Sequence, residues 1–523
     1  MDIDTVAGGG DRLSRLSDGV LGHILSFLPA PEAARAAALS RRWRHVFSAV
    51  HTLSFDESDG RPNHQDDDDD VDVSSAWSSD CYNHSPTRPP RSVPAPPFAT
   101  GVLAALLGRH RGAARARAPL HALRVRFDYF SEAASATAMD ALVSYAVLDA
   151  GGELRHVDLR FGGGPICNRE YSLGQHEPAS PPSTNDYAVP TSLFFSCTAL
   201  RTLRLGPCKL NLPSTITLPS LDMMHLVRVT DTRSSTNIQR LVSSCPRLAD
   251  LSLEACLELT ELSVLGTRLR SLTLKCCHDL TSVAIIDSSQ LEKFKYRGVM
   301  PPPPFLTLHG AHRISWCALD FCGDEASNPA QLVGLAALLQ LFASTKYLRL
   351  KSARLGCSIG HGIFSSLRGG FPVLSHIEIT GMVPDGDTAV IATMRRILEW
   401  SPSLEIVSLF FLPELEEIDE NNYRYYNEDE VHDAHKLSYR YVDLPVPEGA
   451  MIRCLRERAR EINFVHYQGA MAQRMVAKFL LRNAPVVDEV CCEFATGPLI
   501  IQNKLMEEIK GWTMNKSANM MFF

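Results

Sequence analysis

The chain has 523 residues, of which 45% are hydrophobic and 21% are charged, and its formal net charge is -7. A length well above the roughly 100–200 residues of one domain predicts several modules or a long repeat array, and the composition is that of an ordinary globular protein. Ten acidic residues and one arginine between Asp56 and Asp80 hold most of the negative charge, so the chain lacks the global basic excess of a nucleic-acid-binding protein.

The N-terminal residues and the cysteines indicate the compartment. The first ten residues are acidic and lack the basic and apolar stretches of a signal peptide. No run of about eighteen apolar residues occurs, so we expect no membrane partner. The 14 cysteines are scattered along the chain, which favours free thiols in a reducing compartment. We therefore expect a cytoplasmic protein, a nuclear protein, or one found in both places.

Residues 11–47 predict three short helices. Asp18 is expected to cap the first helix, and Pro29 is expected to end it. Pro31 suits the first turn of a second, alanine-rich helix, and Ser40 is expected to cap a third. A unit of about forty residues has a marginal core, so a partner that covers its apolar surface would stabilise it. The first helix carries one apolar stripe at helical spacing, formed by Leu21, Ile24, Leu25 and Leu28.

The order D-R-L-S-x-L-x-D, then I-L-S-F-L-P, then L-S-R-R-W-R closely resembles the F-box of plant F-box/leucine-rich-repeat proteins. The resemblance places the F-box at 11–52. It implies binding to a Skp-type adaptor, which links an F-box protein to a cullin–RING ubiquitin ligase. The adaptor contacts of the family carry over to residues on or beside the stripe, namely Leu16, Val20, Leu21, Ile24, Leu25, Leu28 and Pro29.

The stretch also departs from the family. Ser17 stands where proline is usual, and Phe47 stands where tryptophan is usual. Gly19 and Gly22 fall inside the first helix, and each costs up to about 1 kcal/mol relative to alanine. These departures leave two alternatives open: a degenerate F-box that binds the adaptor weakly, and a plain helical cap on the rest of the fold.

Residues 56–98 change abruptly to aspartate, serine and proline. Such a composition does not bury enough apolar surface to fold alone, so it predicts a disordered linker. Three further interruptions are expected to be long loops, at 162–190, 301–304 and 413–443, the last within an acidic loop at 413–445.

A repeat with the pattern L-x-x-L-x-L, in which other apolar residues replace some leucines, runs through residues 99–412. Its shortest steps are 21, 27, 21 and 22 residues, which lie in the range of leucine-rich repeats. The copies are Leu120-Leu123-Val125, Leu154-Val157-Leu159, Leu200-Leu203-Leu205, Leu221-Met224-Leu226, Leu248-Leu251-Leu253, Leu269-Leu272-Leu274, Leu291-Phe294-Tyr296, Trp316-Leu319-Phe321, Leu374-Ile377-Ile379 and Leu404-Val407-Leu409, with a degenerate copy at Leu348-Leu350.

Two smaller regularities accompany the repeat. In four copies a proline stands two residues before the first apolar position, at Pro219, Pro246, Pro372 and Pro402. In three copies a cysteine follows the last apolar position by three residues, at Cys208, Cys256 and Cys277. This is the Asn/Cys position of the leucine-rich repeat, where a small polar side chain satisfies turning backbone groups.

These patterns predict an α/β fold, a small three-helix F-box followed by a leucine-rich-repeat solenoid. The last two apolar positions of each copy point inward, parallel strands form the concave face, and helices pack outside. Two of the outer helices are marked by apolar residues at helical spacing, Ile238, Leu241, Val242 and Cys245 in one and Ile391, Met394 and Leu398 in the other.

The stretch 454–494 resembles the FBD module found at the end of such plant proteins, through its C-L-R start, its E-I strand and F-L-x-x-N-A-P-V. We place this module at 446–523 and expect it to continue the solenoid. Val490 and Cys492 repeat the strand spacing of the earlier copies, and Ile462 and Phe464 do so one repeat before. The apolar tail at 499–505 is expected to cover the open end of the array.

Motifs for catalysis or metal binding are weak. His309-x-x-His312 and His432-x-x-His435 have no accompanying ligands, and solvated histidines are the favoured interpretation. The aspartate run at 66–70 lacks the alternating ligands and central glycine of a calcium loop. No phosphate-binding loop, nucleophile elbow or nucleophile–base set occurs. We expect no cofactor and no catalytic residue.

The cysteine pattern also argues against a metal site. Cys276, Cys277 and His278 are contiguous, a poor arrangement for a zinc site, which usually separates its ligands. Cys277 already fills the cysteine position of its repeat. Cys317 and Cys322 are interpreted as lone, buried thiols. We therefore expect no metal.

Basic residues beside the inward-pointing positions are candidates for contact with a client protein. A basic strip on the concave face would suit an acidic client, a phosphorylated one or an anionic small molecule, and ordinary solvated charge is the alternative. The candidates are Arg201, Arg204, Arg270, Lys293, Lys295, Lys346 and Arg349.

The primary hypothesis is a non-catalytic substrate-recognition subunit of an SCF-class (Skp–cullin–F-box) E3 ubiquitin ligase. Its F-box would bind the Skp-type adaptor and through it a cullin, and its repeats would bind a client protein. The alternative is a repeat scaffold with a degenerate F-box and no role in ubiquitination. An enzyme on a repeat frame has no supporting motif.

Overall fold

The structure is a computed structural model of the chain. It divides into two compact units, residues 1–164 with 183–221 and residues 165–182 with 222–523, here called the N-terminal and C-terminal units. The residues described are 13–36, 39–56, 98–110, 118–127, 133–150, 152–161, 187–231, 236–310, 313–322, 328–355, 369–383, 389–412, 436–442, 444 and 451–523. Most of the predicted linker (57–97) and of two predicted loops (162–186 and 413–435) lies outside these ranges.

The N-terminal unit begins with the predicted short helices. Ser17, and not the predicted Asp18, caps the first, because its hydroxyl accepts a hydrogen bond from the Val20 backbone N–H at 3.4 Å. Ser40 caps the third as predicted. The helices are η1 (Leu13–Arg15), α1 (Asp18–Leu25), α2 (Ala30–Ala36), α3 (Arg41–Ser48), α4 (Phe98–His110), α5 (Ala133–Asp149) and α6 (Leu193–Ser196). The strands are β1 (Thr52–Asp56), β2 (Ala122–Phe127), β3 (His156–Phe161), β4 (Thr202–Leu205) and β5 (Cys208–Leu210).

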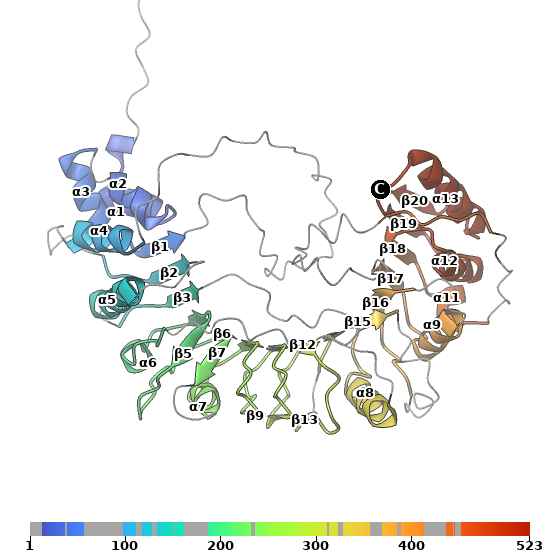
Figure 1. Ribbon diagram of the computed structural model, residues 1–523, viewed down its shortest axis with the longest axis horizontal. Helices are drawn as coiled ribbons and strands as arrows, with labels where there is room; N and C mark the ends of the chain where they lie inside the picture. The colour runs from blue at the N-terminus through green and yellow to red at the C-terminus, as the bar shows by residue number, and fades with distance from the viewer. Residues whose placement is uncertain are drawn as a thin grey trace, which may run out of the picture. The chain divides into compact units, whose positions relative to one another are not determined.

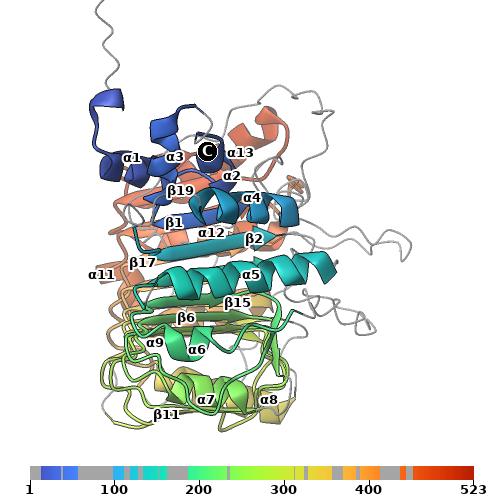
Figure 2. The same cartoon turned by 90° about the vertical axis from the view of Figure 1, so that its left-hand side faces the viewer.

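Strands β1 to β4 pair in parallel and in chain order. The predicted inward positions align across them, since Leu123 of β2 pairs with Leu53 and with Val157. Helices α4 and α5 lie on one face of this sheet (Figures 1 and 2). The pattern search missed β1, which directly follows the F-box segment and supplies the first strand of the array. Asp56 and Phe98, the predicted ends of the linker, therefore belong to β1 and α4.

The C-terminal unit continues the same architecture. Its main sheet is parallel, in the order β6-β8-β10-β12-β14-β15-β16-β17-β18-β19-β20. These strands are β6 (Met223–Val227), β8 (Asp250–Glu254), β10 (Ser271–Lys275), β12 (Lys293–Gly298), β14 (Trp316–Phe321), β15 (Tyr347–Arg354), β16 (His376–Met382), β17 (Ile406–Phe411), β18 (Glu461–Tyr467), β19 (Glu489–Phe494) and β20 (Asn519–Phe522). The helices are α7 (Asn237–Ser243), α8 (Pro329–Leu341), α9 (Ala389–Trp400), α11 (Arg453–Glu457), α12 (Met471–Asn483) and α13 (Leu499–Trp512). The remaining strands are β7 (Val229–Asp231), β9 (Glu261–Val264), β11 (Ser282–Ile285) and β13 (Leu306–Leu308).

The predicted strand register is confirmed in every copy of the C-terminal unit except the one at β14. There Cys317 pairs with Phe294, and Leu319 pairs with Tyr296. The copy is therefore Ile314-Cys317-Leu319, and the predicted Trp316-Leu319-Phe321 is wrong by two residues. The large aromatic side chain at Trp316 imitated the first apolar position of the copy, which the buried Ile314 occupies, and the small buried Cys317 occupies the second.

Outer helices were predicted throughout, but three outer segments are strands. Strands β9, β11 and β13 form a small parallel sheet of their own. An extended strand rises about 3.3 Å per residue against about 1.5 Å for a helix, so a short repeat crosses the outer face in fewer residues as a strand. The shortest repeats adopt this solution, and alternating core residues such as Val283 and Ile285 in β11 fit it.

The cysteine position behaves as predicted. The Cys256 thiol donates to the backbone carbonyl of Leu226 at 3.8 Å, and the Cys277 thiol donates to that of Leu253 at 3.7 Å. Each cysteine thereby satisfies a carbonyl of the preceding repeat. A hydrogen bond to Cys256 and burial raise the pKa of the Cys277 thiol well above its usual range, so Cys277 is a protonated donor.

The C-terminal region continues the sheet in the predicted register. Val490 of β19 pairs with Ile462 of β18, which pairs with Val407 of β17. The apolar tail predicted as a cover is helix α13, in which Leu505 is buried and Leu499 is exposed. A further strand, β20, follows it and ends the sheet, which the pattern search did not anticipate. None of the described helices combines the length and the apolar character needed to cross a membrane.

Candidate protein-docking surfaces

The F-box helices form a small core held together by one polar clamp. Val46 and Phe47 of α3 are buried with the apolar side of α1. The Arg42 guanidinium on α3 donates to the Asp18 carboxylate at 2.8 Å and to the backbone carbonyl of Leu16. Arg42 therefore ties α3 to the start of α1 and fixes how the two helices cross.

The predicted adaptor-binding residues separate into two groups. Leu21 and Leu25 are buried, because they form the core that α1 shares with α3. The other two stripe residues, Ile24 and Leu28, and the adjacent Val20 are exposed, while Leu16 and Pro29 are half-buried. Only the exposed group is available to a partner without rearrangement of the F-box.

Three exposed apolar residues of the F-box were not predicted as contacts. Phe27 has 76% of its surface exposed, and Leu13 and Leu39 are also exposed. The I-L-S-F-L-P motif contained Phe27, but the stripe was followed at helical spacing and skipped it. Because α1 ends at Leu25, Phe27 lies in the turn beyond the helix, where helical spacing no longer applies.

The F-box is joined to the first strands by a buried ion pair. The Arg109 side chain on α4 is completely buried, and its guanidinium lies 2.9 Å from the carboxylate of Asp149, which is 4% exposed. The same guanidinium donates to the backbone carbonyl of Val50, directly after α3, and to that of Ala118 at 2.6 Å. One side chain thus links the end of the F-box, helix α5 and the segment that leads into β2.

A second surface is the open face of the main sheet in the C-terminal unit, formed by side chains that alternate with the buried ones. Strand register aligns an aromatic row there, in which the rings of Trp316 and Tyr347 stack with centroids 5.5 Å apart. The His376 ring follows, 4.6 Å from Tyr347. The next row holds Arg349, whose guanidinium lies 2.8 Å from the Glu378 carboxylate, and the Tyr347 hydroxyl donates to the same carboxylate.

Burial and that carboxylate determine the protonation of this group. Burial raises the pKa of Tyr347 well above its usual range, and the Glu378 carboxylate adds to the effect. Burial also lowers the pKa of His376, against the opposing influence of Glu378. At neutral pH the row is therefore a set of uncharged rings beside one paired Arg–Glu couple.

The seven predicted client-binding residues do not form one uniform strip. Arg204, Lys293, Lys295 and Arg349 lie within strands and alternate with buried positions. The other three, Arg201, Arg270 and Lys346, directly precede strands and lie at the edge where the strands begin. The backbone carbonyls of Arg270 and Lys346 join neighbouring repeats: that of Arg270 accepts from the N–H groups of Glu292 and Lys293, and that of Lys346 accepts from those of Ser375 and His376.

Charge on the open face of the C-terminal unit is mixed. Glu254 lies 3.6 Å from the Lys275 ammonium and 3.1 Å from the His225 ring, and Arg297 lies 3.5 Å from Asp320. These acidic residues lie directly opposite the cations on the neighbouring strand, as Glu378 does opposite the predicted Arg349, so the basic inner strip stays a prediction with acidic neighbours. The pattern search considered only the basic partners.

Comparison with known proteins agrees with this architecture. The family model of the F-box domain matches residues 13–54, and a model described as "FBD-associated F-box protein At5g56370, LRR repeats" matches residues 175–304. The F-box/LRR-repeat protein At3g59200 of Arabidopsis thaliana is 51% identical over 55 residues, 10% of this chain and 11% of the relative. The F-box/FBD/LRR-repeat protein At4g26340 of the same plant is 26% identical over 247 residues, 47% of this chain and 44% of the relative.

The chain is therefore similar to plant F-box/LRR/FBD proteins in its F-box and repeat segments. The matched stretches span about a tenth of the first relative and less than half of the second. The F-box match covers helices α1 to α3 and enters β1. The exposed group on α1 falls inside that match.

Three histidines join the segment that matches the F-box model to the strands that follow. His23 on α1 lies 2.8 Å from the His51 ring, measured from Nδ1 to Nε2, and the rings of His51 and His121 lie 5.7 Å apart. Thr52 Oγ1 lies 3.2 Å from His51 Nδ1, and Glu153 lies 3.5 Å from the His121 ring. Burial lowers the pKa of His51, and the positive charges of His23, His121 and Arg109 lower it further.

This cluster predicts that acid destabilises the N-terminal unit. Since the pKa of His51 is lower in the folded than in the unfolded chain, its contribution to stability is fully present above the ordinary histidine pKa of about 6.5 and is lost as the pH falls through the folded pKa. We expect the urea concentration at the midpoint of unfolding to be lower at about pH 5.5 than at about pH 7.5. The substitution His51→Gln should reduce this difference. Urea titrations at both pH values measure it, with the exposed His45→Gln on α3 as control. Equal pH dependence in His51→Gln and the wild type would contradict the assignment.

Proposed function

We propose that the protein is the substrate-recognition subunit of an SCF-class E3 ubiquitin ligase. Its F-box binds a Skp-type adaptor, and through it a cullin, while its repeats hold a client protein for ubiquitination. The observation that carries the proposal is the exposed apolar group formed by Val20 and Ile24 on α1 and Leu28 in the turn beyond it, within a segment that matches the F-box family model. Exposed apolar side chains that adjoin one another on a short helix mark an interaction site.

Energetics support adaptor docking at this group. Burying a leucine-sized side chain is worth about 1.5–3 kcal/mol, so two or three such residues supply most of the affinity of a micromolar interface. Phe27 extends the same apolar surface beyond α1 and offers the largest exposed ring of the described F-box residues. The Arg42 clamp keeps α1 and α3 in place, so little ordering is needed when the adaptor binds.

The scaffold alternative depends on Ser17, which replaces the proline usual in the family. Ser17 caps α1, so the helix begins in an ordered way without proline. The departure therefore leaves the adaptor-binding helix intact, and the ligase proposal is favoured over a degenerate F-box.

The client is proposed to contact the open face of the C-terminal unit at the aromatic row. Aromatic and arginine side chains dominate the binding energy of many interfaces. Here Trp316 and Tyr347 present stacked rings, and the exposed Lys293 lies beside Trp316 in the same row of the sheet. A client with an apolar anchor and a neighbouring acidic group fits this surface better than a uniformly acidic one, because Arg349 is already paired with Glu378.

The chain itself is proposed to be non-enzymatic. Chemistry would come from other subunits of the ligase, and this protein would contribute proximity and orientation. We propose that it acts in the cytosol, the nucleus or both, and that its partners are proteins and neither nucleic acid nor membranes.

The test is the double substitution Ile24→Asp with Leu28→Asp. We expect binding to a purified Skp-type adaptor to weaken at least about a hundredfold, because two apolar contacts worth together about 3–6 kcal/mol are replaced by charge. Isothermal titration calorimetry measures the affinity. Both residues are exposed, so the melting temperature of the variant should stay close to that of the wild type.

Leu148→Asp on α5 is the matched control, because Leu148 is 81% exposed and lies outside the F-box. Its affinity for the adaptor should equal that of the wild type. Unchanged adaptor affinity in the double variant would refute the F-box assignment. A wild-type protein that captures the adaptor and clients but supports no ubiquitin transfer in a reconstituted ligase would establish the scaffold alternative.

A further inference from the structure

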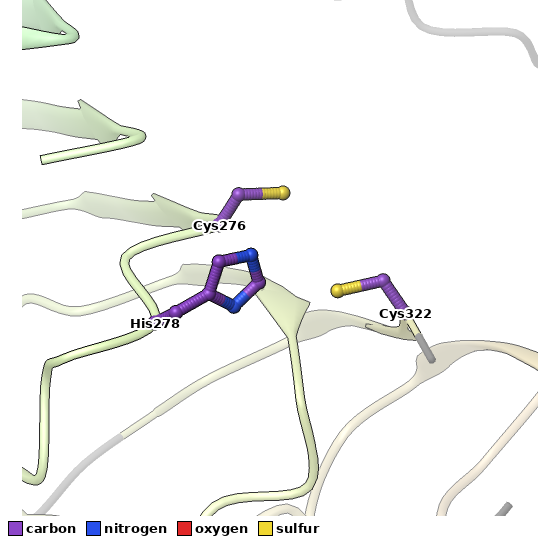
Figure 3. A group of neighbouring side chains, drawn as sticks. All are labelled: Cys276, His278 and Cys322. Atoms are coloured by element: carbon purple, nitrogen blue, oxygen red, sulfur yellow. The ribbon is translucent and has the colours of Figure 1, made fainter. Parts of the chain in front are cut away.

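Three side chains from two separate segments of the sequence converge in the C-terminal unit. Cys276 directly follows β10, His278 comes two residues later, and Cys322 directly follows β14. Their ligand atoms, two sulfurs and an imidazole nitrogen, all lie within 4.8 Å of one another. Figure 3 shows the two thiols and the ring turned toward a common space.

The fold brings the two cysteines together from strands that are not neighbours, since β12 lies between β10 and β14. Both are anchored to the end of β12. The Cys276 N–H donates to the carbonyl of Arg297 at 2.6 Å, and the Cys322 N–H donates to the carbonyl of Gly298 at 3.0 Å. Gly298 has no side chain to intervene, and a Cβ there would lie 2.7 Å from the Tyr296 hydroxyl.

A left-handed turn separates the adjacent cysteines. Cys276 has φ of 53°, as Ala255 has 49° after β8 and Arg228 has 48° after β6, so the turn is a property of the repeat. It sends Cys277 back to the carbonyl of Leu253 and leaves Cys276 on the other side with His278. Contiguity in the sequence, which argued against a metal site, is therefore no obstacle.

The surroundings suit a buried soft metal. Cys276 is 1% exposed and Cys322 is 4% exposed, and Val299 packs against both. His278 is half-buried, so one side of the group stays accessible. An apolar shell of this kind strengthens the attraction between a cation and thiolates, because little water competes with them.

We propose that Cys276, His278 and Cys322 bind a zinc ion. Thiolate and imidazole are the preferred ligands of zinc, with bonds of about 2.3 Å to sulfur and about 2.0–2.1 Å to nitrogen. Two sulfurs of a tetrahedral site then lie about 3.8 Å apart, so side-chain movements of about 1 Å complete the site. Water takes the fourth position. The ion would join the turn after β10 to the end of β14 and brace three strands of the array.

The binding experiment uses the purified full-length protein in reducing buffer. We expect about one zinc per chain by elemental analysis, and on replacement with cobalt(II) a thiolate-to-cobalt charge-transfer band with tetrahedral ligand-field bands. Cys276→Ser with Cys322→Ser should abolish both signals, and His278→Ala should lower the zinc occupancy. Cys317→Ala, which removes a buried thiol from β14, the strand that Cys322 directly follows, should keep both.

A stability measurement provides an independent readout. Added zinc should raise the melting temperature of the wild type and of Cys317→Ala but not that of the double serine variant, because a metal that binds only the folded state stabilises it. Zinc content equal in the wild type and the double variant would overturn the proposal. So would a Cys276–Cys322 disulfide, found by mass spectrometry in protein kept under reducing conditions.

Discussion

Arg109→Met is expected to lower the free energy of unfolding of the N-terminal unit by about 3–5 kcal/mol, the largest effect of a single substitution that we predict. Removing one partner of a buried ion pair leaves the other charge uncompensated, and that cost far exceeds the value of an exposed pair. Here the stranded group is the Asp149 carboxylate. The carbonyls of Val50 and Ala118 lose their donor in the same step.

Chemical denaturation measures the change in the free energy of unfolding. Two further variants test whether the change comes from the unpaired buried charge. Arg109→Met with Asp149→Leu removes both charges and should recover part of the loss, because an apolar pair of similar volume tolerates burial. Arg453→Met on α11 breaks an exposed i,i+4 pair with Glu457 and should change stability by less than about 0.5 kcal/mol. An Arg109→Met protein as stable as the wild type would show that the guanidinium does not stabilise the contact between the F-box and the first strands.

The position of Arg109 also has a consequence for unfolding. Its contacts reach the end of the F-box, α5 and the approach to β2, so these elements should lose structure in one transition. Separate transitions of the F-box and the first strands, followed by fluorescence of Trp43 and by far-ultraviolet circular dichroism, would contradict this expectation.

Much of the sheet was predictable because the repeat records the alternation of a strand directly. In Leu251-x-Leu253 or Leu272-x-Leu274, each apolar residue points into the core and each intervening residue points away, and the pairing follows in register. The pattern gave the wrong register in the copy at β14, because the large Trp316 is not a core residue there and the small Cys317 is. The outer face was less predictable, since chain length between strands, rather than periodicity, decides between helix and strand there.

Docking residues were harder to predict than the fold. The stripe on α1 contained both core and surface leucines, and helical spacing does not distinguish them until α3 is placed against one side. Arg109 lies in a helix whose sequence gives no sign that a charge is buried there, because its partner Asp149 belongs to another helix. The same is true of Cys322, whose neighbours Cys276 and His278 come from two strands away. Contacts between distant segments are the part of a site that local patterns do not encode.

The largest effect of a deletion is expected from removing residues 446–523. Strand β17 pairs along its length with β18, so the truncated chain would end in an unpaired strand edge. Buried aromatic contacts would be lost as well, since the Phe411 ring lies 6.4 Å from that of Phe464 and 5.7 Å from that of Tyr467. The hydrogen bond from the Cys454 thiol to the carbonyl of Leu398 on α9, 3.3 Å long, would also be lost.

We therefore expect the protein without residues 446–523 to aggregate or to melt at a clearly lower temperature, because terminal repeats protect the core of a solenoid. Light scattering coupled to size-exclusion chromatography and differential scanning calorimetry measure both outcomes. A shorter deletion of 518–523 removes only β20, whose residues are exposed or half-buried, and should cause a much smaller shift. A monomeric 1–445 protein with the melting temperature of the full chain would instead show that the FBD module is an independent appendage and that β17 needs no cover.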